Sequence, residues 1–197
     1  MKSFDRLVAG LKKLPGIGPK QAERLGIYLL RAPESEVDGL IAALREVKAS
    51  IRPCRRCFDF TDQEFCRICC DAGRDQSLLC VVEEPQDVAA IERTGYKGLY
   101  HVLHGAISPL DGVGPELLRI RELVERVRAK SLPSSEVILA TDPDTEGEAT
   151  ALYVAQLLKS CGPAKVSRIA HGVPLGGDLD YIDERTLSHA LAGRKEM

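Results

Sequence analysis

The chain lacks several features that by themselves would place it in a class of proteins. None of its apolar runs reaches the roughly 18 residues that a membrane-spanning helix needs. Its first residues, Met1 to Asp5, lead into a charged amphipathic pattern instead of an apolar signal region. Long linkers, internal repeats and the recognition-helix signature of a transcription regulator are also missing. We therefore expect a cytoplasmic protein.

The net charge excludes few classes of protein, because the opposite charges of two parts of the chain nearly cancel. The 197 residues carry a formal charge of −2. Residues 1–56 hold 12 lysines and arginines against 6 acidic residues, whereas the remainder holds 15 against 23. The N-terminal part is therefore the one expected to face phosphates, which the rest would repel.

The cysteines are unevenly distributed. Four of the seven form two C-x-x-C pairs, Cys54/Cys57 and Cys66/Cys69, separated by eight residues. Each pair lets two thiolates converge on one ion, so together they predict a closed tetrahedral Zn²⁺ site with one ion per chain. The spacer 58–65 is too short for a core of its own. We expect its three phenylalanines to cover one side of the metal site.

Two other uses of these cysteines stay open. Disulfides are disfavoured because the chain shows no export signal. A redox pair is a further alternative, although two matched pairs are unusual for that role. Cys70 adjoins Cys69 and is a rival ligand, but the mirrored spacing favours Cys69.

The most informative stretch is an acidic one that follows an apolar run. Val137 to Ala140 predicts a buried strand, and residues 149–158 predict a helix. Between them, four carboxylates lie within seven residues: Asp142, Asp144, Glu146 and Glu148. The carboxyl end of a strand is where open α/β sheets carry their sites. Such a cluster is costly unless a cation, donors or water compensates it, and Mg²⁺ prefers carboxylate oxygens.

A second acidic strand end accompanies the first. Leu78 to Val82 is another apolar run, Glu83 follows it, and Pro85 suits the start of a helix. One glutamate after a strand and an acidic cluster after another resembles the Toprim domain. That domain is shared by topoisomerases, primases, some nucleases and a recombination-repair family. The alternative is a solvated acidic loop whose charges favour the helix N-terminus.

The N-terminal part predicts three helices. Residues 4–13 show an apolar stripe at helical spacing, and a third helix is expected over 36–51. The string L-P-G-I-G-P-K at 14–20 separates the first helix from the second.

This string has the pattern of a phosphate-binding turn. Gly16 and Gly18 allow a tight turn, and Pro19 suits the first turn of a helix. The helix N-terminus offers N–H groups to an anion, and Lys20 and Arg24 lie four residues apart on the same side. The pattern resembles a helix-hairpin-helix element, which grips the DNA backbone without reading bases. A plain packing corner between helices is the alternative.

Strands and helices alternate in the rest of the chain. Besides the two strands above, we expect strands at 98–103 and 165–170 and helices at 86–93 and 116–130. This alternation predicts an α/β fold with a mostly parallel sheet.

The order of these modules closely resembles that of the bacterial RecR family of recombination mediators. The resemblance covers nearly the whole chain and includes I-S-P at 107–109, E-G-E-A-T-A at 146–151 and G-V-P-L-G-G at 172–177. It implies four parts: a helix-hairpin-helix domain (1–53), a small four-cysteine zinc module (54–76), a Toprim domain (77–172) and a short helical tail (173–197) involved in oligomer contacts.

The resemblance also implies a function. Members act with RecO, and in other contexts RecF, to load RecA onto single-stranded or gapped DNA coated by SSB. They bind DNA without sequence preference as a ring, a dimer of dimers, and associate with the nucleoid while acting. Carried onto this chain, Gly16, Gly18, Lys20 and Arg24 face DNA, and the four paired cysteines hold zinc.

The acids leave one question open. Many members of the family carry a non-acidic residue at the position of Asp142 or Asp144, whereas this chain keeps both. Glu83, Asp142, Asp144 and Glu146 are therefore candidates for a Mg²⁺ site or for a basic partner surface.

An enzyme is the main alternative. In a small Toprim nuclease, Glu83 would act as general acid or base while Asp142 and Asp144 hold Mg²⁺. A topoisomerase needs a tyrosine nucleophile on a separate domain, for which the chain has no room. We expect no catalysis, because Tyr153 falls inside a helix and Tyr181 lies in the tail.

Overall fold

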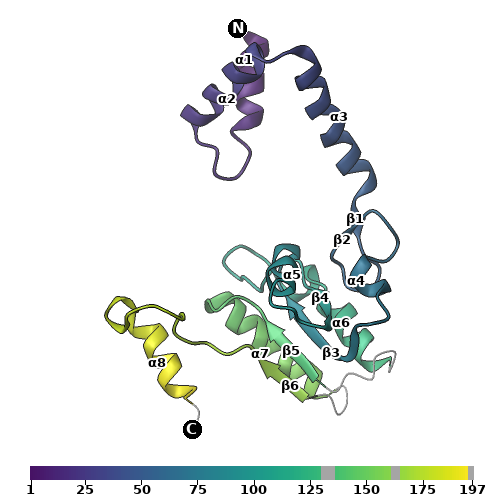
Figure 1. Cartoon of the computed structure of the whole chain (residues 1–197), viewed down its shortest axis with the longest axis vertical. Coiled ribbons are helices and arrows are strands. Elements are labelled where there is room, and N and C mark those ends of the chain that lie inside the picture. The colour runs from purple at the N-terminus through teal and green to yellow at the C-terminus, as the bar shows by residue number, and fades with distance from the viewer. Residues whose placement is uncertain (130–135, 161–164, 195–197) are drawn as a thin grey trace. The chain divides into compact units, whose positions relative to one another are not determined.

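The computed structural model of the chain describes residues 1–129, 136–160 and 165–194. It forms two compact units, Met1–Ile51 and Arg52–Met197, whose elements are labelled in Figure 1. Within the described ranges, no helix is long and apolar enough to cross a membrane.

The first unit consists of three helices, α1 (Lys2–Leu11), α2 (Pro19–Arg31) and α3 (Glu34–Ser50). The first two pack closely, because a β-carbon on Gly26 would lie 3.2 Å from both the Phe4 ring and a Val8 methyl group. Ala22, one turn earlier on α2, is fully buried. The expected helical hairpin is confirmed.

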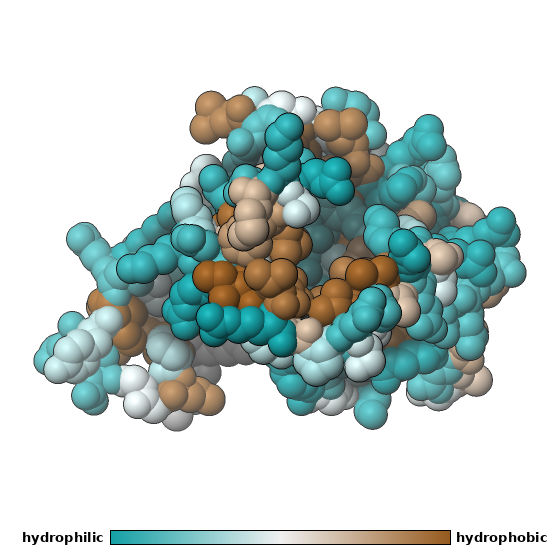
Figure 2. Space-filling model, turned by 90° about the horizontal axis from the view of Figure 1, so that it is seen from above, coloured by the Kyte–Doolittle hydropathy of each residue, from teal (hydrophilic) through white to brown (hydrophobic). Residues whose placement is uncertain are grey.

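The first unit also leaves an apolar groove of about 500 Å³ open among its helices. Leu7, Leu30 and Leu44 line it, one from each helix, and their exposed fractions are 38%, 68% and 59%. Figure 2 shows apolar side chains gathered around a hollow on the face seen from above. Apolar patches of this kind mark association surfaces.

The second unit is built on a four-stranded sheet. The strands are β3 (Asp75–Val82), β4 (Gly98–Val102), β5 (Glu136–Ala140) and β6 (Lys165–Arg168), in the order β4-β3-β5-β6. All of these pairings are parallel, which confirms the expected α/β class. Val82 lies opposite Ala140, so the segments that follow β3 and β5 leave the sheet side by side.

One face of the sheet is covered by two helices. Leu79 and Val81 of β3 pack in an apolar cluster with buried residues of α6 (Ile120–Arg128) and α7 (Thr145–Lys159). The intervening residues of β3 point to the opposite face, as the alternation of a strand requires.

The other face is covered by a helix and by the cysteine module. Cys80 and Val82 pack there with α5 (Pro85–Glu92) and with the paired cysteines. The module contains a short antiparallel pair and one turn of helix: β1 (Arg52–Pro53), β2 (Phe60–Thr61) and α4 (Arg67–Cys70). Because both faces are buried, β3 ends in a continuous apolar run instead of an alternating one.

The outer edge of β4 is covered as well. Tyr100 and Val102 direct their main-chain groups away from β3, as alternate residues of a strand do. The Val102 N–H donates to the Cys57 carbonyl oxygen at 2.8 Å, and the Tyr100 carbonyl oxygen accepts from Arg126 Nη1 at 2.6 Å. Since bare strand edges promote association, the cysteine module and α6 protect this sheet.

The start of α7 differs from the expectation. The helix begins at Thr145 and not at Ala149, because the Asp144 side chain accepts a hydrogen bond from the Gly147 N–H and caps it. Glu146 and Glu148 therefore lie in the first turn of the helix and not in a loop before it.

Two other segments complete the second unit. Pro115–Leu117 forms a 3-10 turn, η1, so α6 begins at Ile120 and not at Glu116. The expected end of that helix, Lys130, lies outside the described residues. The C-terminal tail carries the 3-10 turn η2 (Leu179–Tyr181) and α8 (Glu184–Ala192), which confirms the helical tail.

Candidate functional site

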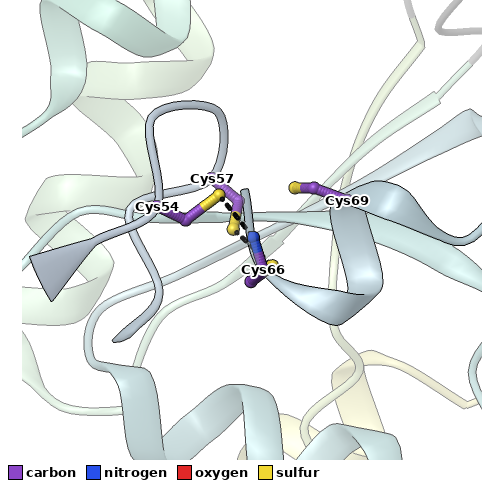
Figure 3. A group of neighbouring side chains, drawn as sticks. All are labelled: Cys54, Cys57, Cys66 and Cys69. Atoms are coloured by element: carbon purple, nitrogen blue, oxygen red, sulfur yellow. Dashed lines mark hydrogen bonds between the residues drawn. The ribbon is translucent and has the colours of Figure 1, made fainter. Parts of the chain in front are cut away.

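The four cysteines of the C-x-x-C pairs come together in one buried cluster. Their sulfur atoms all lie within 4.8 Å of one another (Figure 3). The Cys54 sulfur accepts hydrogen bonds from the backbone N–H groups of Arg56 and Cys66, at 3.5 and 3.3 Å. Donors of this kind favour the ionised thiolate. Cys70 is exposed and lies outside the cluster.

The cluster fits a structural zinc ion. Interaction with Cys54, and then with Cys66 and Cys69, raises the pKa of the Cys57 thiol. Four ionised sulfurs therefore coexist only around a cation, because like charges disfavour one another. Four sulfur ligands without an open position match the closed tetrahedral site of structural zinc, which supplies folding energy when bound.

Aromatic rings cover the cluster less completely than the spacing predicts. Phe58 and Phe65 pack against it, whereas Phe60 is 55% exposed. The expectation of three covering phenylalanines is therefore wrong at Phe60, whose ring lies 5.8 Å from that of His104. The Phe58 carbonyl oxygen is 2.8 Å from His104 Nε2, which links the module to the segment after β4.

Glu83 follows β3 and faces the loop after β5. Its side chain is buried, with 8% exposed, and accepts a hydrogen bond from the Asp142 N–H at 3.0 Å. Burial raises the pKa of Glu83, and the charges of Asp142 and Asp144 raise it further, while the hydrogen bond opposes them. Glu83 thus gains a proton more readily than a surface glutamate.

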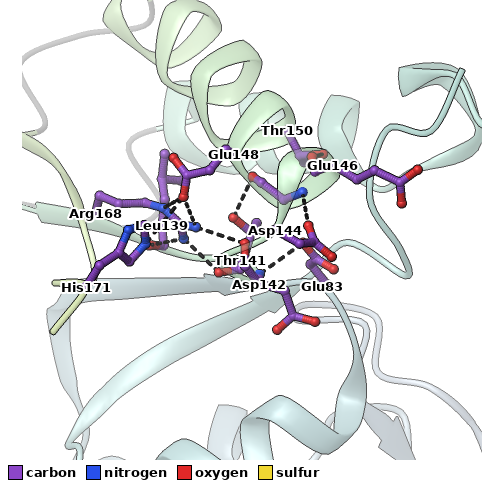
Figure 4. A network of polar contacts seen from close by, with 11 residues as sticks. Glu83, Leu139, Thr141, Asp142, Asp144, Glu146, Glu148, Thr150, Arg168 and His171 are labelled. Carbon is purple, nitrogen blue, oxygen red and sulfur yellow. Dashed lines mark hydrogen bonds and ion pairs between the residues drawn. The ribbon is translucent and has the colours of Figure 1, made fainter. Parts of the chain in front are cut away.

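Three of the other acids each have a separate partner, and Figure 4 shows the contacts of Asp144 and Glu148. The pairs are Asp144 with the Gly147 N–H at 2.7 Å, Glu146 with Ser108 Oγ at 2.5 Å, and Glu148 with Arg168 Nη2 at 2.6 Å. The carboxylates of Asp142 and Glu146 diverge from that of Glu83.

The acids do not form a gathered ligand set in this conformation. Within the described ranges, the paired cysteines are the group of three or more metal-ligating side chains whose ligand atoms lie within 4.8 Å of one another. The carboxylates of Glu83, Asp144, Glu146 and Glu148 instead accept hydrogen bonds from neighbouring donors. A Mg²⁺ ion would have to displace some of these contacts, because it requires near-octahedral oxygen ligands.

Arg168 holds this acidic region together, although no sequence motif marks it as a functional residue. From the end of β6 it donates to the carbonyl oxygens of Leu139, Thr141 and Asp142, at 3.1, 2.8 and 3.1 Å. The same guanidinium pairs with Glu148. Its planar fork therefore fixes the loop after β5. A cation at the end of the strand next to an acidic strand end is the signal that could have identified it.

The start of α2 has the local geometry that the sequence predicts for an anion site. Gly16 has a φ of +76°, a conformation that favours glycine. Gly18 caps the helix, and a β-carbon on it would meet no atom within 4 Å. Lys20 and Arg24 are exposed on the first two turns. Backbone N–H groups and two cations thus lie at one exposed helix end.

A helix-hairpin-helix unit, a four-cysteine module and a parallel sheet with acidic strand ends define a multi-module protein of the Toprim class. Family models match residues 4–48 as "RecR, helix-hairpin-helix", 77–170 as "Toprim domain" and 172–195 as "RecR, C-terminal". The chain belongs to the RecR family of recombination proteins.

Curated relatives are similar to this chain in sequence along nearly its whole length. The chain is 55% identical to the recombination protein RecR of Rubrobacter xylanophilus, over 100% of this chain and 98% of the relative. It is 55% identical to that of Myxococcus xanthus, over 98% of each. For Syntrophotalea carbinolica the identity is 53%, over 99% of this chain and 97% of the relative.

Gly147 tests the close approach of α7 to the acidic loop. Alanine in a helix interior is usually more stable than glycine by about 1 kcal/mol. Here the β-carbon would collide with the Asp142 carbonyl oxygen and lie 2.7 Å from Glu83 Oε1. We expect Gly147→Ala to lower the free energy of unfolding by about 1–3 kcal/mol, measured by urea denaturation.

Gly39→Ala in α3 is the control, because a β-carbon there meets no atom within 4 Å. It should leave stability unchanged or raise it. If the Gly147→Ala protein is as stable as the wild type, the loop after β5 can move aside at no cost in free energy.

Proposed function

We propose that the chain is a recombination mediator in DNA repair. It binds DNA through phosphate contacts and without sequence preference. With RecO, and in other contexts RecF, it promotes the loading of RecA onto single-stranded or gapped DNA coated by SSB. The proposal extends what the relatives' name, recombination protein RecR, says of them. In this proposal the protein acts in the cytoplasm, where it associates with the nucleoid.

One contrast between the two units carries this proposal. Lys20 and Arg24 are exposed at a helix end, free to meet phosphates. Glu83 and Asp144, in contrast, already accept hydrogen bonds from main-chain N–H groups. A nuclease needs carboxylates that gather metal and a positioned nucleophile. The arrangement supports a DNA-binding protein without a catalytic centre.

The acids then have a different use. We assign Glu83, Asp142, Asp144 and Glu146 to a surface that attracts a divalent ion or a basic partner. Asp142 is exposed, and its carboxylate diverges from its neighbours. Binding at this surface alters partner affinity without cleavage of DNA.

Self-association is part of the proposal. The apolar groove of the first unit, with Leu30 68% exposed, is suited to a second copy of the chain. Contacts of this kind, together with the C-terminal tail, build the ring-like dimer of dimers.

We assign one structural Zn²⁺ to the four sulfurs of each chain. Metal analysis of freshly purified, reduced protein should therefore find about one zinc per chain. Cys57→Ser should lose the ion and lower the melting temperature, because an incomplete ligand set leaves three buried sulfurs without their cation. Cys70→Ser is the matched control, since Cys70 is exposed and outside the cluster. Protein that purifies without zinc would refute the assignment.

DNA binding should depend on the hairpin and on salt. We expect Lys20→Ala and Arg24→Ala each to weaken binding to all sequences alike. Each should reduce the slope of log affinity against log salt by about 1, because one phosphate contact is lost. Fluorescence anisotropy with two unrelated oligonucleotides measures both effects.

Lys48→Ala, an exposed change on α3, serves as the control and should bind as the wild type does. If the Lys20/Arg24 double variant retains wild-type affinity at low salt, the DNA site lies elsewhere.

A reconstituted reaction separates mediator from nuclease. With RecO present, the protein should relieve the inhibition by SSB of RecA filament formation, followed by the ATPase activity of RecA. Labelled single-stranded and gapped DNA should stay intact in Mg²⁺ and in Mn²⁺. Cleavage that disappears in Glu83→Gln would instead make the protein a metal-dependent nuclease.

A further inference from the structure

Helix α6 carries Arg126, whose guanidinium group is buried. Arg126 Nη1 donates to the Tyr100 carbonyl oxygen at 2.6 Å. Its other two nitrogens, Nε and Nη2, are buried and have no hydrogen-bond partner in the part of the chain that the structure describes. A buried cation with unused donors is costly unless negative charge lies near it.

Arg126 and the cysteine cluster meet at the same strand edge. The main-chain groups of Tyr100 and Val102 are two residues apart on β4, about 7 Å along the strand. Arg126 bonds to the first, and the second donates to the Cys57 carbonyl oxygen at 2.8 Å. The buried Tyr100 side chain belongs to the same packed cluster as the four cysteines. The guanidinium is therefore a neighbour of the metal-binding module.

The surrounding charges identify what the guanidinium faces. Burial lowers the pKa of Arg126, negative charge on Cys69, Cys57 and Cys54 opposes this, and the positive charge of Arg56 adds to the lowering. His101 also has a buried ring nitrogen without a partner among the described residues. Burial lowers its pKa to about 3, and the positive charge of Arg126 acts in the same direction, so the ring is neutral and supplies no negative charge. The sulfurs supply the negative charge.

We infer that Arg126 is the buried counter-ion of the metal–thiolate cluster, a positioning residue supplied by the Toprim domain. The inference rests on the zinc site proposed above. Zn²⁺ with four thiolates carries a net charge of −2, which favours a nearby cation in a buried place. Arg56 contributes from the solvent side, where its Nη1 donates to the Cys69 carbonyl oxygen at 2.9 Å. The metal affinity of the module thus depends on a residue far away in the sequence.

Two substitutions separate charge from hydrogen bonding. Arg126→Lys keeps a cation and a donor for the Tyr100 carbonyl oxygen, whereas Arg126→Gln keeps a donor and removes the cation. Zinc affinity is measured on the full-length holoprotein by competition with a chromophoric chelator. We expect Arg126→Gln to bind zinc about 10–100-fold more weakly, the range typical of residues around a metal site. Arg126→Lys should retain most of the zinc affinity that Arg126→Gln loses.

Arg121→Gln is the matched control on the same helix, because the Arg121 side chain is 82% exposed. It should hold zinc as the wild type does. Equal zinc affinity of the Arg126→Gln and Arg126→Lys proteins overturns the inference while leaving the zinc site intact. If wild-type protein holds no zinc, the site itself fails and the inference with it. If Arg126→Gln does not fold, Arg126→Met takes its place with the same expectation.

Discussion

Burial of negative charge is the constraint on which the second unit depends. Glu92 is 17% exposed and pairs with Arg74 at 2.5 Å, while the Tyr100 hydroxyl donates to the same carboxylate at 2.8 Å. Glu83 accepts a hydrogen bond from a backbone N–H, and the four cysteine sulfurs lie within 4.8 Å of one another, so they could all be ionised only around a cation. Each of these buried anions has a donor or a positive charge beside it, because an uncompensated one costs several kcal/mol. The sheet, the acidic region and the cysteine module are thus linked by charge as well as by packing.

The two units use charge in opposite ways. In the first unit, cations and the N–H groups of a helix end face solvent, where they can bind an anion. In the second, Arg168 ties three carbonyl oxygens and Glu148 into one fixed loop. In this arrangement the acidic side chains accept hydrogen bonds from separate donors and are not gathered around one metal position. This difference supports the proposed binding role of a Toprim fold that keeps its acidic residues.

Local patterns predicted most of the fold. The spacing of Cys54, Cys57, Cys66 and Cys69 is short-range information, and the apolar runs before Glu83 and Asp142 locate the strand ends. The sequence pattern predicts too late a start for α7, because a run of acids is typical of a loop, although Asp144 is also a good capping residue. The roles of Arg168 and Arg126 are not predicted, since they arise from packing between distant elements, which periodicity cannot show.

The cysteine module covers the outer edge of β4, where a further strand could otherwise pair. Its Cys57 carbonyl oxygen occupies the place of a neighbouring strand opposite the Val102 N–H. Loss of the ion proposed for this cluster would therefore expose the edge of β4 as well as loosen one small loop. A free parallel edge is a template for pairing with other chains. If the cluster holds the proposed Zn²⁺, zinc deprivation would therefore lower the solubility of the protein as well as its activity.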